Sequence, residues 1–332
     1  MKRFSESELK ILHLLSDRTC YSIEYIALHL NLSIPEVLRL LNQLTELDLA
    51  IKHVPMKGYQ LSKPIQILDE QIIRQNLELR GYRNPFNFHL FAELNSTNQF
   101  LKELPLDTVP DICCAEKQTQ GRGRFGRKWI SPFGENIYFS GRWNLECSLA
   151  DLSGLSLVVG LATLASLKHS LSTEDIRIKW PNDILWGNKK LCGILIELGN
   201  ISSNCAQVII GIGLNVNTAT QDQPKVGLPW CSLYEITDNY FDRNKIIADL
   251  IFHLRNYLAS FFISGFSFFM DEWKNFDYLR GQFVQVSQSA GFLSGTACGV
   301  NEQGQLVLLD EKDITHNISS GDASLGTSLK EF

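Results

Sequence analysis

Residues 121–128 read Gly-Arg-Gly-Arg-Phe-Gly-Arg-Lys, which places four cations and three glycines in eight positions. The net charge of the whole chain is -5, so this concentration of positive charge is local. Like charges repel each other, and glycine adds to the entropy lost when such a loop is ordered. A bound anion would offset both costs, because glycine lets backbone N–H groups approach phosphate oxygens and arginine grips them with two hydrogen bonds. A solvated basic loop is the alternative interpretation.

The surroundings of this loop exclude the best-known phosphate-binding folds. Its glycines match the G-x-G-x-x-G of dinucleotide-binding domains, but that motif opens a helix, and residues 129–134 contain a proline and a glycine that break any helical run. A P-loop needs Lys followed by Ser or Thr where this chain has Arg127 and Lys128. The protein-kinase loop has Val where Lys128 stands, and the chain has no His-Arg-Asp sequence. The sequence therefore predicts phosphate binding in another fold.

A second group of polar residues follows at Lys179-Trp-Pro-Asn-Asp183. Pro181 ends a strand, which places Asn182 and Asp183 in a turn, and Gly187-Asn188 then forms the turn of a hairpin. Lys190 begins the second strand of that hairpin, so its ammonium can point from a rigid edge into a cleft. Ordinary surface lysines on a hairpin are the alternative. The expected strands are 176–180, 184–186 and 190–198.

A third group is Glu93-Leu-Asn-Ser96-Thr97-Asn98-Gln99, at the start of a helix expected to run through about Leu104. Ser96 or Thr97 is a natural N-cap. The first turn of a helix offers free backbone N–H groups beside these hydroxyl and amide side chains. The segment either caps its own helix or holds the polar head group of a ligand.

These segments, in this order, resemble one family: the biotin–protein ligases of the bifunctional type that also represses the biotin operon. The resemblance covers nearly the whole chain. It rests on the GRGRFGRKW loop, the KWPND turn, the KKLCGILIE hairpin and the later strand end Gly211-Ile-Gly-Leu-Asn215-Val-Asn217. It implies that ATP, with Mg²⁺, activates biotin to biotinyl-5′-AMP. A specific lysine of the biotin carboxyl carrier protein of acetyl-CoA carboxylase then accepts the biotin.

The resemblance also implies roles for single residues. Lys190 is expected to touch both the biotin carboxylate and the α-phosphate, and the basic loop to close over the adenylate and exclude water. The expected catalytic residues are Lys190, Arg124 and Arg122. The expected biotin-binding residues are Ser96, Thr97, Asn98, Gln118, Arg122, Gly123, Arg124 and Lys190. The expected ATP- and adenylate-binding residues are Gly121, Arg124, Arg127, Trp129, Lys179, Asn182, Asp183 and Asn215. Phe125 stands where the best-known repressor-type relative has arginine, so a phosphate or dimer contact at that position does not follow.

Residues 1–64 are predicted to form a winged helix-turn-helix DNA-binding domain. Ser5-x-x-Glu8 is a capping box before a helix with Leu9, Leu12 and Leu15 inward, Ser22 starts a second helix that ends near Leu30, and Ser33-x-x-Glu36 caps a third. Strands 49–54 and 58–61 form the wing. The third helix and the wing supply the expected DNA contacts, which are Ser33, Arg39, Asn42, Gln43 and Lys57.

The charge of this first domain leaves its role open. It holds eight Lys and Arg against seven Asp and Glu, whereas DNA affinity depends heavily on neutralised phosphates. The domain either binds operator DNA weakly or is a structural appendage. In the family that the chain resembles, adenylate binding promotes a homodimer, which would join two such DNA-binding domains.

The remaining chain is predicted to be an α+β multi-domain protein. A linker helix spans 65–84, and the catalytic domain spans 85–275 with a mixed or antiparallel sheet and two long helices, 152–171 and 243–262. The resemblance implies the biotin–lipoate ligase type of fold, which is class II synthetase-like. Residues 276–332 are predicted to form a small SH3-like β-barrel. Its expected strands are 282–286, 295–300 and 306–309.

Composition favours a cytoplasmic protein without a membrane partner. The eight cysteines are scattered with no C-x-x-C pair, which indicates buried thiols in a reducing compartment and no disulfide or zinc site. No structural metal is expected. We also expect neither a signal peptide nor an apolar run long enough to span a bilayer.

Two other functions compete with this hypothesis. A lipoate–protein ligase or octanoyltransferase shares the fold and the transfer of an acyl group to lysine, but it needs a long apolar tunnel and lacks this arginine-rich loop. A transcription regulator that only senses a ligand needs the pocket but has no use for Lys190.

Overall fold

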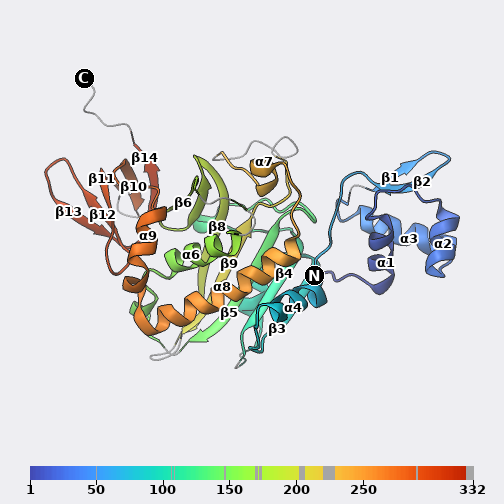
Figure 1. Cartoon of the computed structure of the whole chain (residues 1–332), viewed down its shortest axis with the longest axis horizontal. Coiled ribbons are helices and arrows are strands. Elements are labelled where there is room, and N and C mark those ends of the chain that lie inside the picture. Colours follow the sequence, from blue (N-terminus) through green and yellow to red (C-terminus); the bar gives the residue numbers. More distant parts are fainter. Residues whose placement is uncertain are drawn as a thin grey trace, which may run out of the picture.

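The computed structural model describes residues 1–49, 51–105, 107, 109–145, 147–168, 171, 174–201, 206–219, 229–288 and 291–326. Figure 1 shows three parts along the longest axis. We call them the N-terminal unit (residues 1–64), the central unit (65–275) and the C-terminal unit (276–326).

The N-terminal unit consists of three helices and a hairpin close to the expected positions. Its elements are α1 (Glu6–Leu15), α2 (Ile23–Leu30), α3 (Ile34–Thr45), β1 (Ile51–Val54) and β2 (Gly58–Leu61). The expected capping box is present: Glu8 N–H donates to Ser5 Oγ at 3.2 Å, and Ser5 N–H donates to Glu8 Oε2 at 2.8 Å. One detail was wrong, because Ile11 occupies the core position expected for Leu9, which is only half-buried.

The central unit is a seven-stranded mixed sheet. The strand order is β3-β4-β5-β9-β8-β7-β6, and only β3 and β4 run parallel. The strands are β3 (Asn87–Leu94), β4 (Asp111–Gln118), β5 (Ile137–Leu145), β6 (Ile176–Lys179), β7 (Asp183–Trp186), β8 (Lys189–Ile201) and β9 (Ala206–Leu214). The expected mixed sheet is therefore confirmed.

Helices cover both faces of this sheet. Ile112 and Cys114 of β4 belong to the main core, which also contains α6 (Leu155–Leu167) and α8 (Arg243–Ser264). Cys113 and Ala115 point to the other face, where α5 (Thr97–Glu103) packs. The short helices α7 (Leu233–Thr237) and α9 (Met270–Phe276) complete the unit.

Two segments of the central unit are long enough and apolar enough to cross a membrane. They are Ala150–Leu167 and Arg243–Ser264, with mean hydropathies of 1.6 and 1.4. The expectation that no run reaches this length was therefore wrong. Within the protein, 67% and 50% of these segments are buried. A core helix that packs against a sheet has this composition too, so the apolar runs follow from the packing.

A buried arginine anchors α5 to the sheet. Arg142 of β5 is 2% exposed and pairs with Asp111 of β4. Its guanidinium donates to the backbone carbonyls of Leu101 at 3.1 Å, Leu104 at 2.8 Å and Pro105 at 2.8 Å. Because these carbonyls lie at the C-terminal end of α5, Arg142 holds that end of the helix against the sheet.

The expected linker helix is α4 (Glu70–Leu79), and it is built into the central core. Glu116 at the end of β4 accepts hydrogen bonds from Leu68 N–H at 2.5 Å and from Arg243 Nη1 at 2.7 Å. Both charged side chains are essentially inaccessible to solvent. The pair therefore clamps the segment before α4 to the sheet.

The C-terminal unit is a five-stranded antiparallel sheet in the order β13-β12-β11-β10-β14. The expected strands correspond to β10 (Phe283–Gln288), β11 (Gly291–Val300) and β12 (Leu306–Leu309). The sequence analysis missed β13 (Thr315–Ile318) and β14 (Asp322–Leu325), because both are short and carry few apolar side chains.

We expect Glu116→Gln to lower the free energy of unfolding by about 3–5 kcal/mol, because it leaves the Arg243 guanidinium buried without a counter-ion. Urea denaturation followed by circular dichroism measures this change. Glu70→Gln is the matched control, since its pair with Arg74 lies on the surface of α4 and contributes about 0.5 kcal/mol or less. Equal losses in the two variants would contradict the clamp.

Candidate active site

A cleft of about 590 Å³ lies where the central sheet, the basic loop and the C-terminal unit meet. The loop itself holds a single short turn, Arg124–Gly126, and no helix follows it, as expected. Most of the predicted site residues line the cleft: Ser96, Thr97, Asn98, Gln118, Arg122, Gly123, Arg124, Arg127, Trp129, Lys179, Asn182, Asp183, Lys190 and Asn215. Gly121 does not line it. A Cβ there would lie 2.6 Å from the Trp129 carbonyl, so Gly121 instead closes the base of the loop.

The start of α5 supplies a connected polar wall. Gln118 Oε1 accepts from Thr97 N–H at 2.9 Å, and Asn98 Nδ2 donates to Glu197 Oε2 at 2.8 Å. Ser140 Oγ lies 2.7 Å from Thr97 Oγ1 and 2.6 Å from Asn98 Oδ1. Sequence reasoning did not assign Ser140 or Glu197. Glu197 ends the KKLCGILIE motif and could have been found there, but nothing near Ser140 in the sequence marks it.

Ser96 is the N-cap of α5, and its hydroxyl accepts from Gln99 N–H at 3.5 Å. Capping therefore uses Ser96 and not Thr97. The Thr97 and Asn98 side chains are left to the wall of the cleft, although both are only 4% exposed.

Two glycines of β9 let the site residues approach the sheet. A Cβ at Gly211 would lie 2.3 Å from Asn98 Oδ1, and one at Gly213 would lie 2.5 Å from Trp129 Cε2. No side chain other than hydrogen fits at either position. The indole N–H of Trp129 is buried and has no hydrogen-bond partner in the described structure. It is free to donate to a ligand in the cleft.

Lys190 reaches the cleft from the second position of β8. Its Nζ lies 2.7 Å from Asp183 Oδ1 and 5.4 Å from the centroid of the Trp129 ring. The sequence analysis placed Asp183 in the turn, but Asp183 is the first residue of β7, paired with Gly193. Lys190 pairs with Leu185 in the same register, so its side chain reaches the Asp183 carboxylate diagonally between the two strands.

The loop arginines reach three different parts of the protein. Arg122 Nη2 donates to Gln99 Oε1 at 3.1 Å and lies 3.5 Å from Glu197 Oε2. Arg124 Nη1 donates to Asn182 Oδ1 at 3.2 Å. Arg127 forms an ion pair with Asp322 of β14. The loop is thus fastened to α5, to the β6–β7 turn and to the C-terminal unit.

Phe125 has a positive φ of 55°, and its ring is 68% exposed beneath the guanidinium of Arg124, 4.9 Å from the ring centroid. An aromatic ring in this position shields the arginine without adding charge. The residue therefore supports the loop through a cation–π contact.

The cleft contains more positive than negative charge. Six of its described lining side chains are cationic, whereas Asp183 and Asp322 are its carboxylates. Burial lowers the pKa of Lys179 and of Arg124, although Asp183 and Asp322 oppose this effect. Partly buried cations with too few counter-ions favour an anionic ligand.

The C-terminal unit contributes Asp322, Ala323 and Ser324 of β14 to the same cleft. The sequence analysis missed all three. Their segment reads Gly-Asp-Ala-Ser-Leu, which has neither a motif nor a periodicity that would place it beside a loop two hundred residues earlier.

The predicted DNA contacts lie in the N-terminal unit and do not line this cleft. Ser33 caps α3, and Arg39 and Asn42 are exposed on that helix. Gln43 is half-buried and accepts from Arg39 Nη1 at 3.0 Å, and Lys57 is exposed in the hairpin turn. Within the described chain, no group of three His, Cys, Asp or Glu side chains could hold a metal ion. The seven described cysteines are free thiols, and Cys205 lies outside the described residues.

The comparisons with known proteins agree with this geometry. The Biotin/lipoate A/B protein ligase family matches residues 90–215, which include the polar wall, the basic loop and the hairpin of Lys190. The chain is 34% identical to the bifunctional ligase/repressor BirA of Salmonella typhimurium, over 96% of this chain and 97% of that protein. The corresponding protein of Escherichia coli is 33% identical, over 97% and 98%.

This chain belongs to the bifunctional biotin ligase/repressor family. The biotin protein ligase of Aquifex aeolicus in complex with biotin and ATP has a similar solved structure, with a TM-score of 0.63 at 31% identity. That similarity covers 73% of this chain and 99% of the other. The biotin--[acetyl-CoA-carboxylase] ligase of Mycobacterium tuberculosis is 30% identical, over 77% of this chain and 94% of that protein.

Asp322→Asn should speed tryptic cleavage within residues 122–128 about two- to five-fold. The variant frees Arg127 from the C-terminal unit, and a partly exposed ion pair contributes at most about 1 kcal/mol. Mass spectrometry of timed digests identifies the cleavage sites. Asp310→Asn serves as the control within the same unit, since Asp310 pairs with His316 and does not contact the loop. An unchanged rate in Asp322→Asn would show that the pair does not restrain the loop.

Proposed function

We propose that this protein activates biotin with ATP to form biotinyl-5′-AMP and transfers biotin to a lysine of a biotin carboxyl carrier protein. The observation that carries the proposal is the cleft, which places a hydrogen-bonding polar wall beside a surplus of cations. Such an arrangement suits a ligand with a polar neutral head and an anionic tail. The named relatives and the Aquifex aeolicus complex support biotin and ATP as the two substrates.

The polar wall is proposed to hold the ureido ring of biotin. Thr97, Asn98 and Gln118 present hydroxyl and amide groups, with Ser96 at the start of the same helix. A buried carbonyl and two N–H groups need matched partners, since an unmatched group costs about 1–3 kcal/mol. Ser140 and Glu197 then act behind this wall by fixing the Asn98 amide in one orientation.

Activation requires a carboxylate to approach a triphosphate. A biotin carboxylate oxygen attacks the α-phosphorus, and the bond from that phosphorus to pyrophosphate breaks. Lys190 is proposed to exchange Asp183 for the biotin carboxylate and the α-phosphate, while Arg122 and Arg124 stabilise the charge that develops. Gly123 lets the loop backbone approach the same anions.

The adenylate is proposed to occupy the end of the cleft near Trp129. The unpartnered indole N–H and the amides of Asn182 and Asn215 offer hydrogen bonds, and Lys179 and Arg127 offer positive charge. The proposed adenylate-binding residues also include Asp183, once Lys190 releases it, and Gly121 at the base of the loop.

Magnesium is proposed to arrive with the triphosphate. Of the two described lining carboxylates, Asp322 is paired with Arg127, and Asp183, once Lys190 releases it, is already assigned to the proposed adenylate set. We therefore assign no protein ligand to the ion. Bound there, it would screen the charge of the phosphates.

In the second half-reaction, the amine of the acceptor lysine attacks the acyl carbonyl of the adenylate, the acyl–phosphate bond breaks and AMP leaves. The acyl-adenylate would react with water if the cleft were open, so the loop is proposed to serve as a lid. Its three attachments, through Arg122, Arg124 and Arg127, are contacts between side chains, which can break and re-form as substrates enter and leave.

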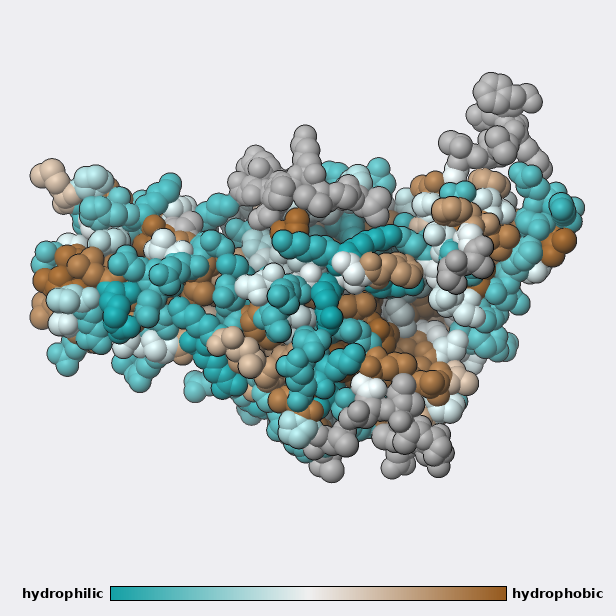
Figure 2. All heavy atoms as spheres, turned by 180° about the vertical axis from the view of Figure 1, so that it is seen from behind, coloured by the Kyte–Doolittle hydropathy of each residue, from teal (hydrophilic) through white to brown (hydrophobic). Residues whose placement is uncertain are grey.

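The N-terminal unit is proposed to be a winged helix-turn-helix that represses transcription when biotin is plentiful. Support comes from the name of the relatives and from the order of its three helices and hairpin. The unit also exposes apolar side chains, among them Tyr25, Leu28 and Leu38. Figure 2 shows apolar surface gathered at that end of the molecule. A homodimer formed on adenylate binding would place two weakly binding N-terminal units on one palindromic operator.

Several finer assignments belong to the same proposal. The domain boundaries are taken as 1–64, 65–84, 85–275 and 276–332, with an SH3-like barrel as the last domain and a class II synthetase-like sheet in the third. A cytoplasmic location follows from the acceptor proposed, and free thiols at the described cysteines are compatible with it.

Neither competing function is favoured. A lipoate or octanoate ligase would need an apolar tunnel, whereas the wall at α5 is polar, and a pure ligand sensor would not need Lys190. Incubation with ATP and a biotin carboxyl carrier domain, with biotin or lipoate supplied, tests the proposal. Streptavidin-detectable transfer from biotin alone is the expected result. Transfer from lipoate alone, or from neither acid, would overturn it.

Lys190→Ala should slow biotin-dependent pyrophosphate release about 10²–10³-fold, because a charge directed at the reacting anions is lost. The fold should persist, since Lys190 lies at the edge of the cleft with its side chain 25% exposed. Lys189→Ala is the matched control, because its exposed side chain lies next along the strand and does not line the cleft. Release within tenfold of the wild-type rate would remove Lys190 from the mechanism.

DNA binding should tighten when biotin and ATP are added, and it should be lost at modest salt concentrations, because a nearly neutral DNA-binding unit binds weakly even at low salt. Lys57→Ala should lower the slope of log affinity against log salt by about one per bound reader, without changing biotin transfer. Gel-shift titrations on the protein's own biotin-synthesis promoter measure both effects. No shift at low salt, with or without biotin and ATP, would mean that the N-terminal unit is no longer a repressor.

A further inference from the structure

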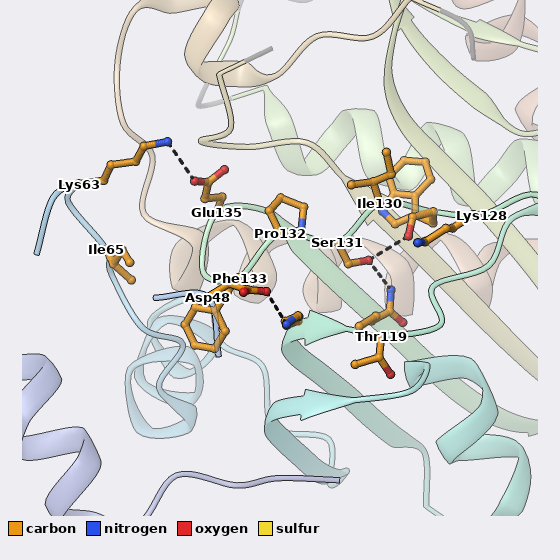
Figure 3. A pocket seen from close by; sticks show the side chains of 13 residues that line it. Asp48, Lys63, Ile65, Thr119, Lys128, Ile130, Ser131, Pro132, Phe133 and Glu135 are labelled. Atoms are coloured by element: carbon orange, nitrogen blue, oxygen red, sulfur yellow. Dashed lines mark hydrogen bonds and ion pairs between the residues drawn. The ribbon is translucent and has the colours of Figure 1, made fainter. Parts of the chain in front are cut away.

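A second cleft, of about 550 Å³, separates the N-terminal unit from the central unit. Figure 3 shows it from close by, with Lys63 paired with Glu135 on one side and Ser131 near its floor. On the other side lies Asp48, labelled in Figure 3, which forms an ion pair with Lys117. The cleft also borders Gln118, which lines the active site as well. Gln118 is therefore one of five residues that line both clefts, with Lys128, Trp129, Ile130 and Pro132.

The N-terminal unit rests on the strands that carry the Gln118 side chain. Lys2 pairs with Glu93 on the free edge of β3, since Lys2 N–H donates to the Glu93 carbonyl at 2.7 Å. Phe4 meets the edge of Phe133, with ring centroids 6.1 Å apart. Ala92 and Phe133 of the central unit are buried in the core of the N-terminal unit. The ends of β3 and β4 are thus part of the contact between units.

The last three residues of β4 make three different contacts. Glu116 holds the segment before α4, as described above, and Gln118 accepts from Thr97 in the active site. Lys117 lies between them, and because side chains alternate along a strand it points to the opposite face. There it meets the N-terminal unit. One short stretch of backbone therefore joins the linker, the N-terminal unit and the polar wall.

Lys117 has two carboxylate partners, one from each unit. Its Nζ lies 2.6 Å from Asp48 Oδ2, three residues beyond the end of α3, and 3.1 Å from Glu93 Oε2 of β3. Its side chain is 19% exposed. Burial disfavours the ammonium, but the hydrogen bonds to the two carboxylates outweigh burial and raise the pKa of Lys117. Lys117 is therefore charged at neutral pH and shared between the units.

We propose that Lys117 is a positioning residue of the biotin pocket, and that Asp48 links it to the placement of the N-terminal unit. While Asp48 holds the ammonium, the end of β4 is fixed and Gln118 stays aligned with Thr97. When the N-terminal unit shifts, Lys117 keeps only Glu93, and the restraint on the backbone next to Gln118 weakens. The inference rests on the proposed function, which names biotin as the ligand of that wall.

The test compares biotin-dependent pyrophosphate release in full-length variants. Asp48→Asn removes one carboxylate from the triplet without touching the active site. It should raise the KM for biotin about two- to five-fold and leave kcat unchanged, since the pair is partly exposed and the effect is on substrate binding. Lys117→Met should do the same, and Lys117→Arg should restore the wild-type KM. The double variant Asp48→Asn with Lys117→Met should be no worse than either single variant.

Glu46→Gln is the matched control, because it removes the same charge two residues from Asp48 and has no ion pair in the described structure. A KM for biotin that rises equally in Glu46→Gln, or effects of Asp48→Asn and Lys117→Met that simply add, would overturn the inference. Failure of the proposed function would look different, because wild-type protein would then release no pyrophosphate with biotin. In that case titration calorimetry of biotin with the same variants gives the same comparison, and equal affinities would overturn the inference.

Discussion

Among the described residues of this protein, six cationic side chains line one cleft, together with the two carboxylates of Asp183 and Asp322. Lys190 and Arg127 are balanced by ion pairs, whereas Lys179 and Arg124 are partly buried and their pKa values are lowered by burial. Partial burial disfavours the charged forms of these side chains, and a bound anion would offset that cost. This imbalance explains why a chain with a net charge of -5 concentrates arginine and lysine in eight residues.

The fold holds the imbalance in place with buried pairs elsewhere. The ion pair of Arg142 with Asp111 fixes α5, and the ion pair of Arg243 with Glu116 fixes the end of β4. Both elements that supply the polar wall are therefore held in place. Gly211 and Gly213 then let Asn98 and Trp129 lie directly on the sheet. Strand β9 pairs with both β5 and β8, and it thus brings the neutral polar wall and the cationic part of the site together.

Much of the fold and of the site could be predicted from local sequence. The capping residues Ser5 and Ser96 marked helix starts, and Pro181 with Gly187 marked the hairpin that places Lys190. The missing parts depend on long-range packing. Asp322 reaches Arg127 only because the C-terminal unit folds back over the loop, and Lys117 meets Asp48 only because the N-terminal unit rests on β4. Ser140 was invisible for the same reason, since its role exists only once β5 lies under α5.

In the proposed function, one cleft holds biotin and AMP joined as a single ligand. Titration calorimetry with a non-hydrolysable biotinyl-adenylate analogue, and with biotin and AMP separately, tests it most directly. Two groups that are linked and bind side by side gain effective concentration, so the analogue should bind about 10²–10⁴-fold more tightly than either part. Lys190→Ala should lower the affinity for the analogue more than the affinity for AMP alone, because Lys190 is proposed to contact both the acyl group and the phosphate. An analogue that binds no more tightly than biotin would contradict the account.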